Sequence, residues 1–399
     1  MRRLLGLTLV LGAFLLALQG CGQSSTPPAP AGTTETVEKP TLEAEKPTGA
    51  KEDKATKEPT SSEKKLRLGL VTSEGRVNDG TFNQLAHEGA SKAIKELGWE
   101  YKYIETQAKT DYAKNIQTFV DEKYDIIITI GFPIADATFA AAKENPKVTF
   151  IGVDQSFSGK NQKDESLELP NLVGIQARED QAGFLAGSLA GMLTKSGTVG
   201  VVGGIDIPPV KRFKNSFENG AKYAKPEVKV LSVYIPSFID PAQGASAAKQ
   251  FLGEGADVLL GAGGTTGSGA IKAAAEQGAF VMGVDQDEYV TTFANGKTPG
   301  ADKIVTSAVK RVDVGVVNEL RAIAKGTFKG NGNYVLDASN GGIGYAEFHQ
   351  TDAVVPENVK ERLKGIEKLL ASGKLTTGVN FASGDVDKAT MPEPMKIEP

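Results

Sequence analysis

The sequence predicts an α/β protein of two lobes, each a parallel sheet flanked by helices, with a ligand cleft between them. The main observation is a module that occurs twice, as DIIITIGFPIADATFAAAKENPKVTFIGVDQ at 125–155 and DVLLGAGGTTGSGAIKAAAEQGAFVMGVDQ at 257–286. Each copy has an apolar run, a Gly-containing turn, an Ala-rich amphipathic stretch and a second apolar run, which is typical of a strand-helix-strand unit. The rest of the folded part alternates strands and helices in the same way, and apolar strands of this kind form parallel sheets covered on both faces.

The first half is expected to begin with a strand at 66–72. A helix at 82–97 follows from apolar residues at helical spacing, and Gly98 ends it. The pattern then gives a strand at 99–105, a helix at 112–123, the first module and a short link at 172–176.

The second half is expected to begin with a helix at 178–194, whose Ala and Gly residues allow close packing. The further expected elements are a strand at 198–203, a helix at 211–224, a strand at 229–235, a helix at 242–253, the second module, a strand at 304–307, a helix at 309–324, short strands at 334–337 and 344–346, and a helix at 357–372.

Residues 1–20 have the pattern of a targeting segment. Arg2 and Arg3 precede an apolar run at 4–18 that is short for a membrane span, and small residues follow. Cys21, the only cysteine of the chain, sits directly after this segment, as in a bacterial lipobox. We expect Cys21 to be lipidated, since a lone cysteine has no disulfide partner; the alternative is an ordinary secretory signal with a chance cysteine.

Residues 21–65 are rich in Pro, Thr, Ser, Glu and Lys, so we expect a disordered tether that cannot bury enough apolar surface to fold. The expected N-terminal lobe comprises 66–172 and about 289–328. The expected C-terminal lobe comprises 173–288 and about 329–381, followed by a flexible tail at 382–399.

Composition and motifs argue against several functions. A net charge of −4 gives no reason to expect nucleic-acid binding. The chain has two histidines and no HExxH, CxxC or GxSxG motif, so we expect no catalytic residues, metal or cofactor. The acidic run that begins at Asp285 lacks the glycine and distant glutamate of an EF-hand, which favours a solvated turn at Asp287 and Glu288.

Ligand-type side chains follow the expected strands, where open α/β sheets bind ligands. Asp154 and Asp285 each follow the last strand of a module, and carboxylates suit the hydroxyl groups of a polyol. Phe82 and Phe238 lie in loops, where they can stack on a flat ring. Gly264 lies in a Gly-rich loop that lacks the P-loop and dinucleotide motifs, so we interpret it as a close-approach loop.

Each of these features also has a purely structural alternative. Asp79 precedes Gly80 and could serve only a turn. The two phenylalanines could belong to the core. Asp154 and Asp285 could cap following elements, a common use of aspartate.

An ordered series of short runs extends through 66–381: NDGTFNQ at 78–84, IGF at 130–132, FIGVD at 150–154, LAG at 185–187, VGG at 202–204, SFID at 237–240, GAGGTTGSG at 261–269, GVD at 283–285 and TSAVK at 306–310. On these runs the chain resembles the basic membrane protein family of bacterial lipoproteins, the purine nucleoside receptor A-like substrate-binding proteins of ABC transporters. The resemblance implies a type I periplasmic-binding-protein fold, whose chain would cross between lobes near 171–177, 288–299 and 326–333.

The resemblance also implies residue roles. Phe82 and Phe238 would sandwich the purine, with Phe213 a rival for the second ring. Asn83 and Asp154 would bond polar edges of base or sugar. Asp285 would hold the ribose hydroxyls, and Lys310 would lie nearby. The residue pattern alone places Lys310 at the start of a helix. The match departs from many relatives at Asp79 and Thr81, so the loop there could be set differently.

The implied function is a monomeric, lipid-anchored receptor on the extracytoplasmic face of a bacterial cell membrane, carrying acyl chains such as palmitate. It would close on a nucleoside and deliver it to an ABC permease and ATPase. The alternatives are the same fold binding a pentose or other small metabolite, a sensor that signals through a membrane partner, and a nucleoside hydrolase-like enzyme.

Overall fold

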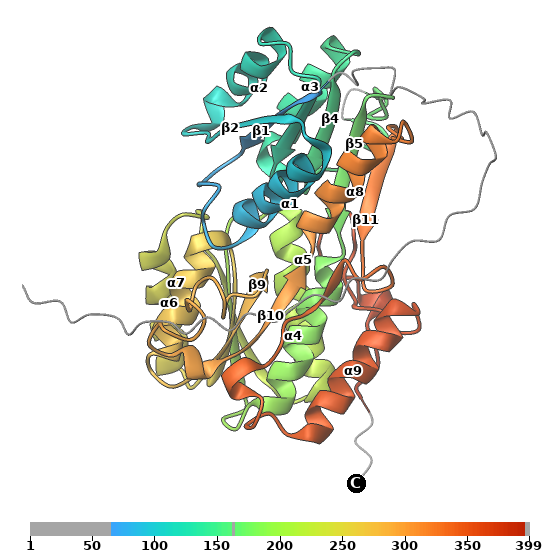
Figure 1. Cartoon of the computed structure of the whole chain (residues 1–399). Helices are drawn as coiled ribbons and strands as arrows, with labels where there is room; N and C mark the ends of the chain where they lie inside the picture. Colours follow the sequence, from blue (N-terminus) through green and yellow to red (C-terminus); the bar gives the residue numbers. More distant parts are fainter. Residues whose placement is uncertain (1–64, 162–163, 396–399) are drawn as a thin grey trace, which may run out of the picture. The chain divides into compact units, whose positions relative to one another are not determined.

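The computed structural model describes residues 65–161 and 164–395. Cys21, the expected targeting segment and the expected tether, apart from its last residue, lie outside the described residues. The described chain forms two six-stranded sheets, each flanked by helices on both faces (Figure 1). The expected fold class is confirmed.

The first sheet has the strand order β11-β5-β4-β3-β1-β2, and all its strand pairs are parallel. Its strands are β1 Arg67–Thr72, β2 Glu100–Ile104, β3 Ile126–Ile130, β4 Thr149–Val153, β5 Leu172–Ala177 and β11 Gly332–Leu336.

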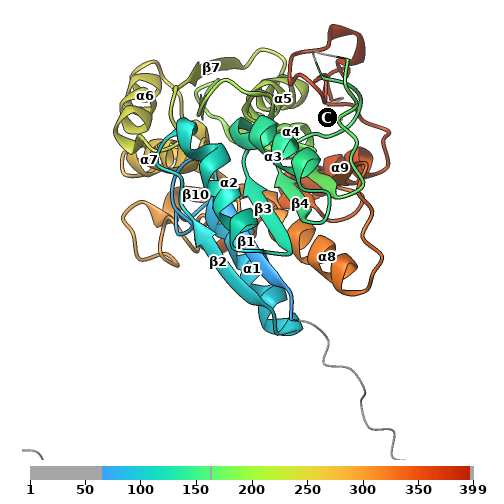
Figure 2. The same cartoon turned by 90° about the horizontal axis from the view of Figure 1, so that it is seen from above.

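Side-chain alternation along the strands divides the first sheet into two buried faces. Leu68 and Leu70 of β1 pack with α1 (Phe82–Leu97) and α8 (Val312–Ala324). Val71 packs on the opposite face with α2 (Tyr112–Asp121) and α3 (Ala135–Glu144). Burial on both faces explains why the strands have near-continuous apolar sequences. Figure 2 shows α2 and α3 lying over β1, β3 and β4.

The second sheet has the order β12-β10-β9-β8-β6-β7 and is parallel except for β12, which pairs antiparallel with β10. Its strands are β6 Thr198–Gly203, β7 Lys229–Tyr234, β8 Val258–Ala262, β9 Phe280–Asp285, β10 Ile304–Lys310 and β12 Ile343–Tyr345.

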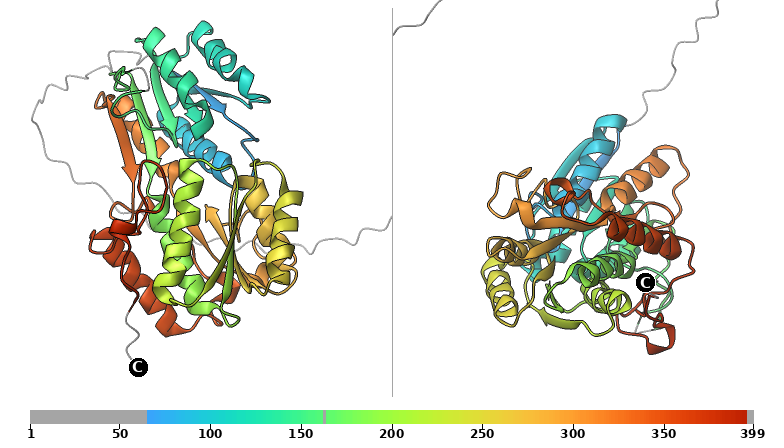
Figure 3. Two further views of the ribbon diagram at one scale, coloured as in Figure 1. Left: turned by 180° about the vertical axis from the view of Figure 1, so that it is seen from behind. Right: turned by 90° about the horizontal axis from the view of Figure 1, so that it is seen from below.

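The second sheet is covered by α4 (Glu179–Leu193) and α5 (Pro208–Ala224) on one face, and by α6 (Pro241–Gly253) and α7 (Gly264–Ala275) on the other. The expected close packing along α4 is confirmed, because a Cβ at Gly187 would lie 2.0 Å from the Phe217 carbonyl oxygen of α5. Helix α9 (Glu357–Ala371) packs against α4. Figure 3 shows these helices from behind and from below.

Short 3₁₀ turns complete the described chain: Lys109–Asp111, Phe132–Ile134, Ala301–Lys303, His349–Thr351 and Lys388–Thr390. None of the helices within 65–161 and 164–395 combines the length and apolar character needed to span a bilayer.

The chain passes between the two sheets three times, after β5, after β10 and between β11 and β12. The first two crossings occur at Arg178 and Arg311, whose backbone angles are nearly identical, φ −81° and ψ 63° against φ −80° and ψ 58°. Each of the two is hydrogen-bonded to the third crossing, through Arg178 N to Leu336 O and Arg311 N to Gly342 O.

Sheet membership differs from the expected lobe bounds in three places. The expected link at 172–176 is the full strand β5 of the first sheet. The expected first-lobe segment 289–328 contains β10, which belongs to the second sheet, and β11 joins the first sheet instead of the second lobe. Strands this short and apolar do not encode which sheet they join, because that depends on tertiary pairing.

The expected tail also differs, since its described part is bound along α5. Asp385 forms an ion pair with Lys211, and Met395 N donates to Tyr223 O. These contacts are polar and backbone-mediated, so the sparse apolar content of the segment did not reveal them.

Candidate functional site

The carboxyl ends of the two sheets enclose a cavity of about 860 Å³, lined by both lobes. This volume is within the range of small-molecule sites. All eight residues predicted to bind ligand line it: Asp79, Phe82, Asn83, Asp154, Phe238, Gly264, Asp285 and Lys310. The rival ring Phe213 lines it as well.

The two Gly-Val-Asp-Gln turns present their aspartates to this cavity in the same way. Asp154 follows β4 and Asp285 ends β9, as the repeat predicted. Both have positive φ, 60° and 68°, a conformation that aspartate adopts more readily than most residues. Neither begins a helix, so the capping alternative is wrong. In each, Oδ1 is buried and has no hydrogen-bond partner.

Lys310 is the last residue of β10, not the first turn of a helix, and only 2 % of it is exposed. Its Nζ donates to Asp154 Oδ2 at 2.7 Å and to Glu179 Oε1 at 3.2 Å, and it lies 3.7 Å from Asp285 Oδ1. Asp154 belongs to the first lobe and Lys310 to the second, so this ion pair joins the lobes across the cavity.

These groups shift one another's pKa values. Burial raises the pKa of Asp285 to about 7, and Lys310 opposes the shift. Burial raises the pKa of Asp154 as well, again opposed by Lys310. Burial alone would lower the pKa of Lys310, but the surrounding carboxylates outweigh it and keep the ammonium charged.

Two residues behind Lys310 were not predicted from the sequence. Glu179, at the start of α4, is fully buried and accepts from Arg212 Nε of α5 at 2.6 Å. Burial raises the pKa of Glu179, yet Arg212 and Lys310 together hold it below its ordinary value. The sequence offered one signal, a Glu-Asp pair at the start of an otherwise apolar, Gly-rich helix.

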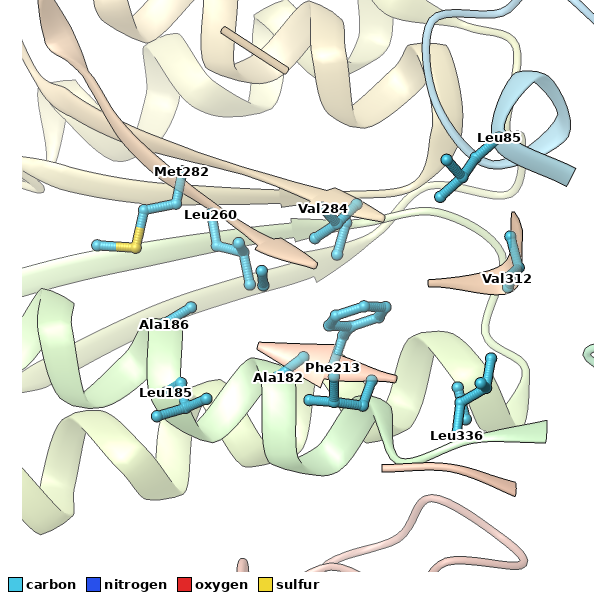
Figure 4. Close-up of a cluster of buried hydrophobic side chains, with 14 of the residues drawn as sticks. Leu85, Ala182, Leu185, Ala186, Phe213, Leu260, Met282, Val284, Val312 and Leu336 are labelled. Atoms are coloured by element: carbon cyan, nitrogen blue, oxygen red, sulfur yellow. The ribbon is translucent and has the colours of Figure 1, made fainter. Parts of the chain in front are cut away.

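The aromatic side chains differ in their exposure to the cavity. Phe82 and Phe238 are half-buried, whereas Phe213 is 4 % exposed and packs in the core near Val284 and Ala182 (Figure 4). Lys310 Nζ lies 4.5 Å from the ring centroid of Phe82, within cation–π range. The geometry therefore favours Phe82 and Phe238 as the two accessible rings.

Glycines form the seat of the Phe238 ring. A Cβ at Gly204 would lie 2.5 Å from Phe238 Cε1, and one at Gly264, whose φ is +56°, would lie 2.8 Å from Phe238 O. No side chain larger than hydrogen fits at either place, so the loops hold the ring in position. This accounts for Gly264 as a close-approach residue.

Asp79 lies on the cavity wall, but its carboxylate is fully used by its own loop. Oδ1 accepts from the backbone N–H groups of Thr81 and Gln84, and Oδ2 accepts from N–H and Nδ2 of Asn83. These bonds satisfy the free N–H groups at the start of α1. The contacts of Asp79 therefore fit a role in the turn before α1 better than direct ligand binding.

Two further buried groups near the cavity were missed. Tyr112 lines the wall, and its hydroxyl is buried without a hydrogen-bond partner. Glu288 was expected in a solvated turn, which is wrong: it is 0 % exposed and accepts from Ser268 Oγ, Thr292 Oγ1 and Val284 N. Its aliphatic stem fits against Gly283, a contact that the sequence does not encode locally.

The side chains of the described residues include no group of three or more His, Cys, Asp or Glu that could hold a metal ion.

A two-lobed fold with a polar and aromatic cavity between its sheets is the architecture of a solute-binding protein. The chain belongs to the family of PnrA-like ABC transporter substrate-binding proteins, whose family model matches residues 67–376. This family comprises binding proteins and not enzymes.

The relatives agree with this assignment, and the solved structures share the fold. The chain is 30 % identical to the ABC transporter nucleoside-binding protein BmpA of Lactococcus lactis, over 78 % of this chain and 88 % of that protein. It is 34 % identical to an uncharacterized lipoprotein of Pyrococcus abyssi, over 71 % of this chain and 69 % of that protein.

Among solved structures, a solute-binding protein of an ABC transporter system from Aeropyrum pernix superposes with a TM-score of 0.68 at 22 % identity. The match covers 78 % of this chain and 92 % of that one. A solute-binding protein from Conexibacter woesei has a TM-score of 0.60 at 26 % identity and covers 78 % and 98 % of the two chains.

Proposed function

We propose that this protein binds a nucleoside, with a purine as the preferred base. The observation that carries the proposal is the presence, in one cavity, of two accessible phenylalanine rings and two aspartates whose buried Oδ1 atoms make no hydrogen bond. Phe82 and Phe238 would enclose the base. Asp285 would accept hydroxyl groups of the ribose, and Asn83 and Asp154 would bond polar edges of the base or sugar.

The charges of the cavity favour a nucleoside over a nucleotide. The acidic lining residues Glu74, Asp79, Asp154 and Asp285 outnumber the basic residues Arg76, Lys109 and Lys310. Lys310 is buried and already contacts three carboxylates, while the other two cations are exposed. A phosphate placed beside the aspartates would therefore be repelled.

Family and relatives support the cellular role that we propose. Closure of the two lobes would enclose the nucleoside, and the closed form would deliver it to an ABC permease and its ATPase. Lipidation at Cys21 would anchor a monomer on the extracytoplasmic face of the cell membrane, in line with the named lipoprotein among the relatives.

Calorimetric titration of the full chain, unfolded and refolded to remove carried-over ligand, tests the proposal. The ligands are adenosine, guanosine, inosine, cytidine, adenine, ribose and adenosine 5′-monophosphate. We expect tight binding of purine nucleosides and weak binding of free base, ribose and nucleotide. The Phe238→Leu variant should lose affinity for nucleosides, because it removes one ring face.

The alternatives give different results. Binding of free ribose without nucleosides would select the pentose-binding alternative and overturn the base assignment. Equal affinity for nucleoside and nucleotide would contradict the charge argument.

A further inference from the structure

Two of the three crossings between the lobes share one local structure. Each is an Arg-x-Asp sequence in which the arginine makes two hydrogen bonds to the aspartate two residues later, Arg178 to Asp180 and Arg311 to Asp313. Together with the matching backbone angles, this shows that the internal repeat extends into these crossings, which form the hinge between the lobes.

The residues around these arginines differ in a complementary way. Glu179 directly follows Arg178, and the equivalent position after Arg311 is Val312. Lys310 directly precedes Arg311, and the equivalent position before Arg178 is Ala177. The acid of one crossing meets the base of the other in the buried Lys310–Glu179 ion pair.

The three carboxylates around Lys310 come from different parts of the molecule. Asp285 and Glu179 belong to the same lobe as Lys310, whereas Asp154 reaches it from the other lobe. If the lobes separate, Lys310 loses Asp154 and keeps the other two. Without Glu179, the remaining partner of Lys310 would be Asp285. In the proposed function, Asp285 binds the ligand.

Arg212 completes this arrangement. Its Nε donates to Glu179, its Nη1 donates to Phe381 O at 2.8 Å, and its guanidinium lies 4.9 Å from the Phe381 ring centroid. A buried carboxylate needs such compensation, and two cations on Glu179 supply it. The carboxy-terminal segment thus fixes the arginine that supports Glu179.

We propose that Glu179 and Arg212 are positioning residues of the ligand site, which hold the Lys310 ammonium at the hinge and leave Asp285 free to accept ligand hydroxyls. Neither touches the cavity, and both act through Lys310. The inference rests on the proposed nucleoside function for its binding readout.

The test compares Glu179→Gln, Arg212→Met and the double variant with wild type, using guanosine calorimetry between pH 5.5 and 8.5. Glu179→Gln keeps the side-chain shape and removes a negative charge, so we expect about tenfold weaker binding, the size of one charge-assisted hydrogen bond. Asp313→Asn at the other crossing is the matched control, because its carboxylate pairs with Arg311 and is not one of the three carboxylates around Lys310. It should bind guanosine within twofold of wild type.

A second readout needs no ligand: the titration of the Asp285 carboxyl followed by ¹³C NMR. Removing the negative charge of Glu179 should lower its midpoint, whereas removing the positive charge of Arg212 should raise it. The double variant removes one charge of each sign, so the midpoint of the Asp285 titration should return toward the wild-type value. This variant can be measured even if one of the single variants is unstable.

The outcomes separate the two proposals. If wild type binds no nucleoside but the midpoints move in opposite directions, the nucleoside function fails and the positioning role stands. If both single variants shift the midpoint the same way, or behave like Asp313→Asn, the positioning role is overturned.

Discussion

The turns at Asp154 and Asp285 have the same Gly-Val-Asp-Gln sequence and the same left-handed aspartate, yet their glutamines differ in their partners. Gln155 is fully buried, and its Nε2 donates to Thr129 and Gly131 of its own lobe. Gln286 Nε2 instead donates across the interface to Thr81 O of the other lobe at 3.0 Å. One glutamine stabilises a lobe, and the other joins two lobes.

The aspartates differ as well. Asp154 Oδ2 accepts a hydrogen bond from Lys310 Nζ at 2.7 Å, whereas Asp285 Oδ1 lies 3.7 Å from the same ammonium and makes no hydrogen bond to it. A repeated motif thus fixes where a side chain is presented, while the surrounding elements decide which partners it has.

The sharpest test of this difference is Asp285→Ala. We expect nucleoside binding to weaken about 100-fold, because two charge-assisted hydrogen bonds at about 1.5 kcal/mol each would be lost. The free protein should lose little stability, since Asp285 Oδ1 makes no hydrogen bond and lies 3.7 Å from Lys310 Nζ. Calorimetry and urea unfolding measure the two effects, with Asp287→Asn in the same loop as control. Unchanged binding would show that Asp285 does not contact the ligand.

The converse is expected for Asp154→Asn. Removing the nearest partner of a buried ammonium should reduce the free energy of unfolding by about 2 kcal/mol, visible as a lower urea midpoint. Nucleoside affinity should fall by less than in Asp285→Ala. Loss of binding with full stability would reverse the roles assigned to the two aspartates.

The pKa of Asp285, near 7, predicts pH-dependent binding. The ionised carboxylate accepts hydroxyl groups, so affinity should rise as pH increases through 7 and fall up to about tenfold per pH unit well below it. For the free protein the sign is opposite: the folded state retains this proton longer than the unfolded chain, so the group's stabilising contribution is lost as pH rises through 7.

Calorimetry and urea unfolding from pH 5.5 to 8.5 measure both trends. Asp285→Ala should remove the pH dependence of its residual binding in this range, and Asp154→Asn should keep it. A flat profile in wild type would contradict the assignment.

The smallest effects are expected at the glutamines. Gln286→Ala removes one hydrogen bond between the lobes, worth about 1 kcal/mol, and should weaken nucleoside binding about fivefold. Gln155→Ala leaves buried groups of one lobe unpaired and should lower the unfolding midpoint instead. Equal effects of both variants on both measurements would remove the distinction between the turns.

Much of the fold was predictable because its signals are local. Apolar runs at strand length and amphipathic stretches at helical spacing gave α1 (Phe82–Leu97) and β6 (Thr198–Gly203) with their observed bounds. The repeat also predicted that Asp154 and Asp285 would lie at strand ends in one cavity.

By itself, therefore, the sequence determined the fold class, the duplicated halves and the side chains offered at the strand ends, since these depend on residues near one another in the chain. The tertiary structure decided that β10 joins the second sheet and β11 the first, and that Glu288 is buried. It also brought Lys310 to Glu179, 131 residues away. The physical reason is that an ion pair depends on which side chains meet after the sheets pack, and no local periodicity encodes that meeting.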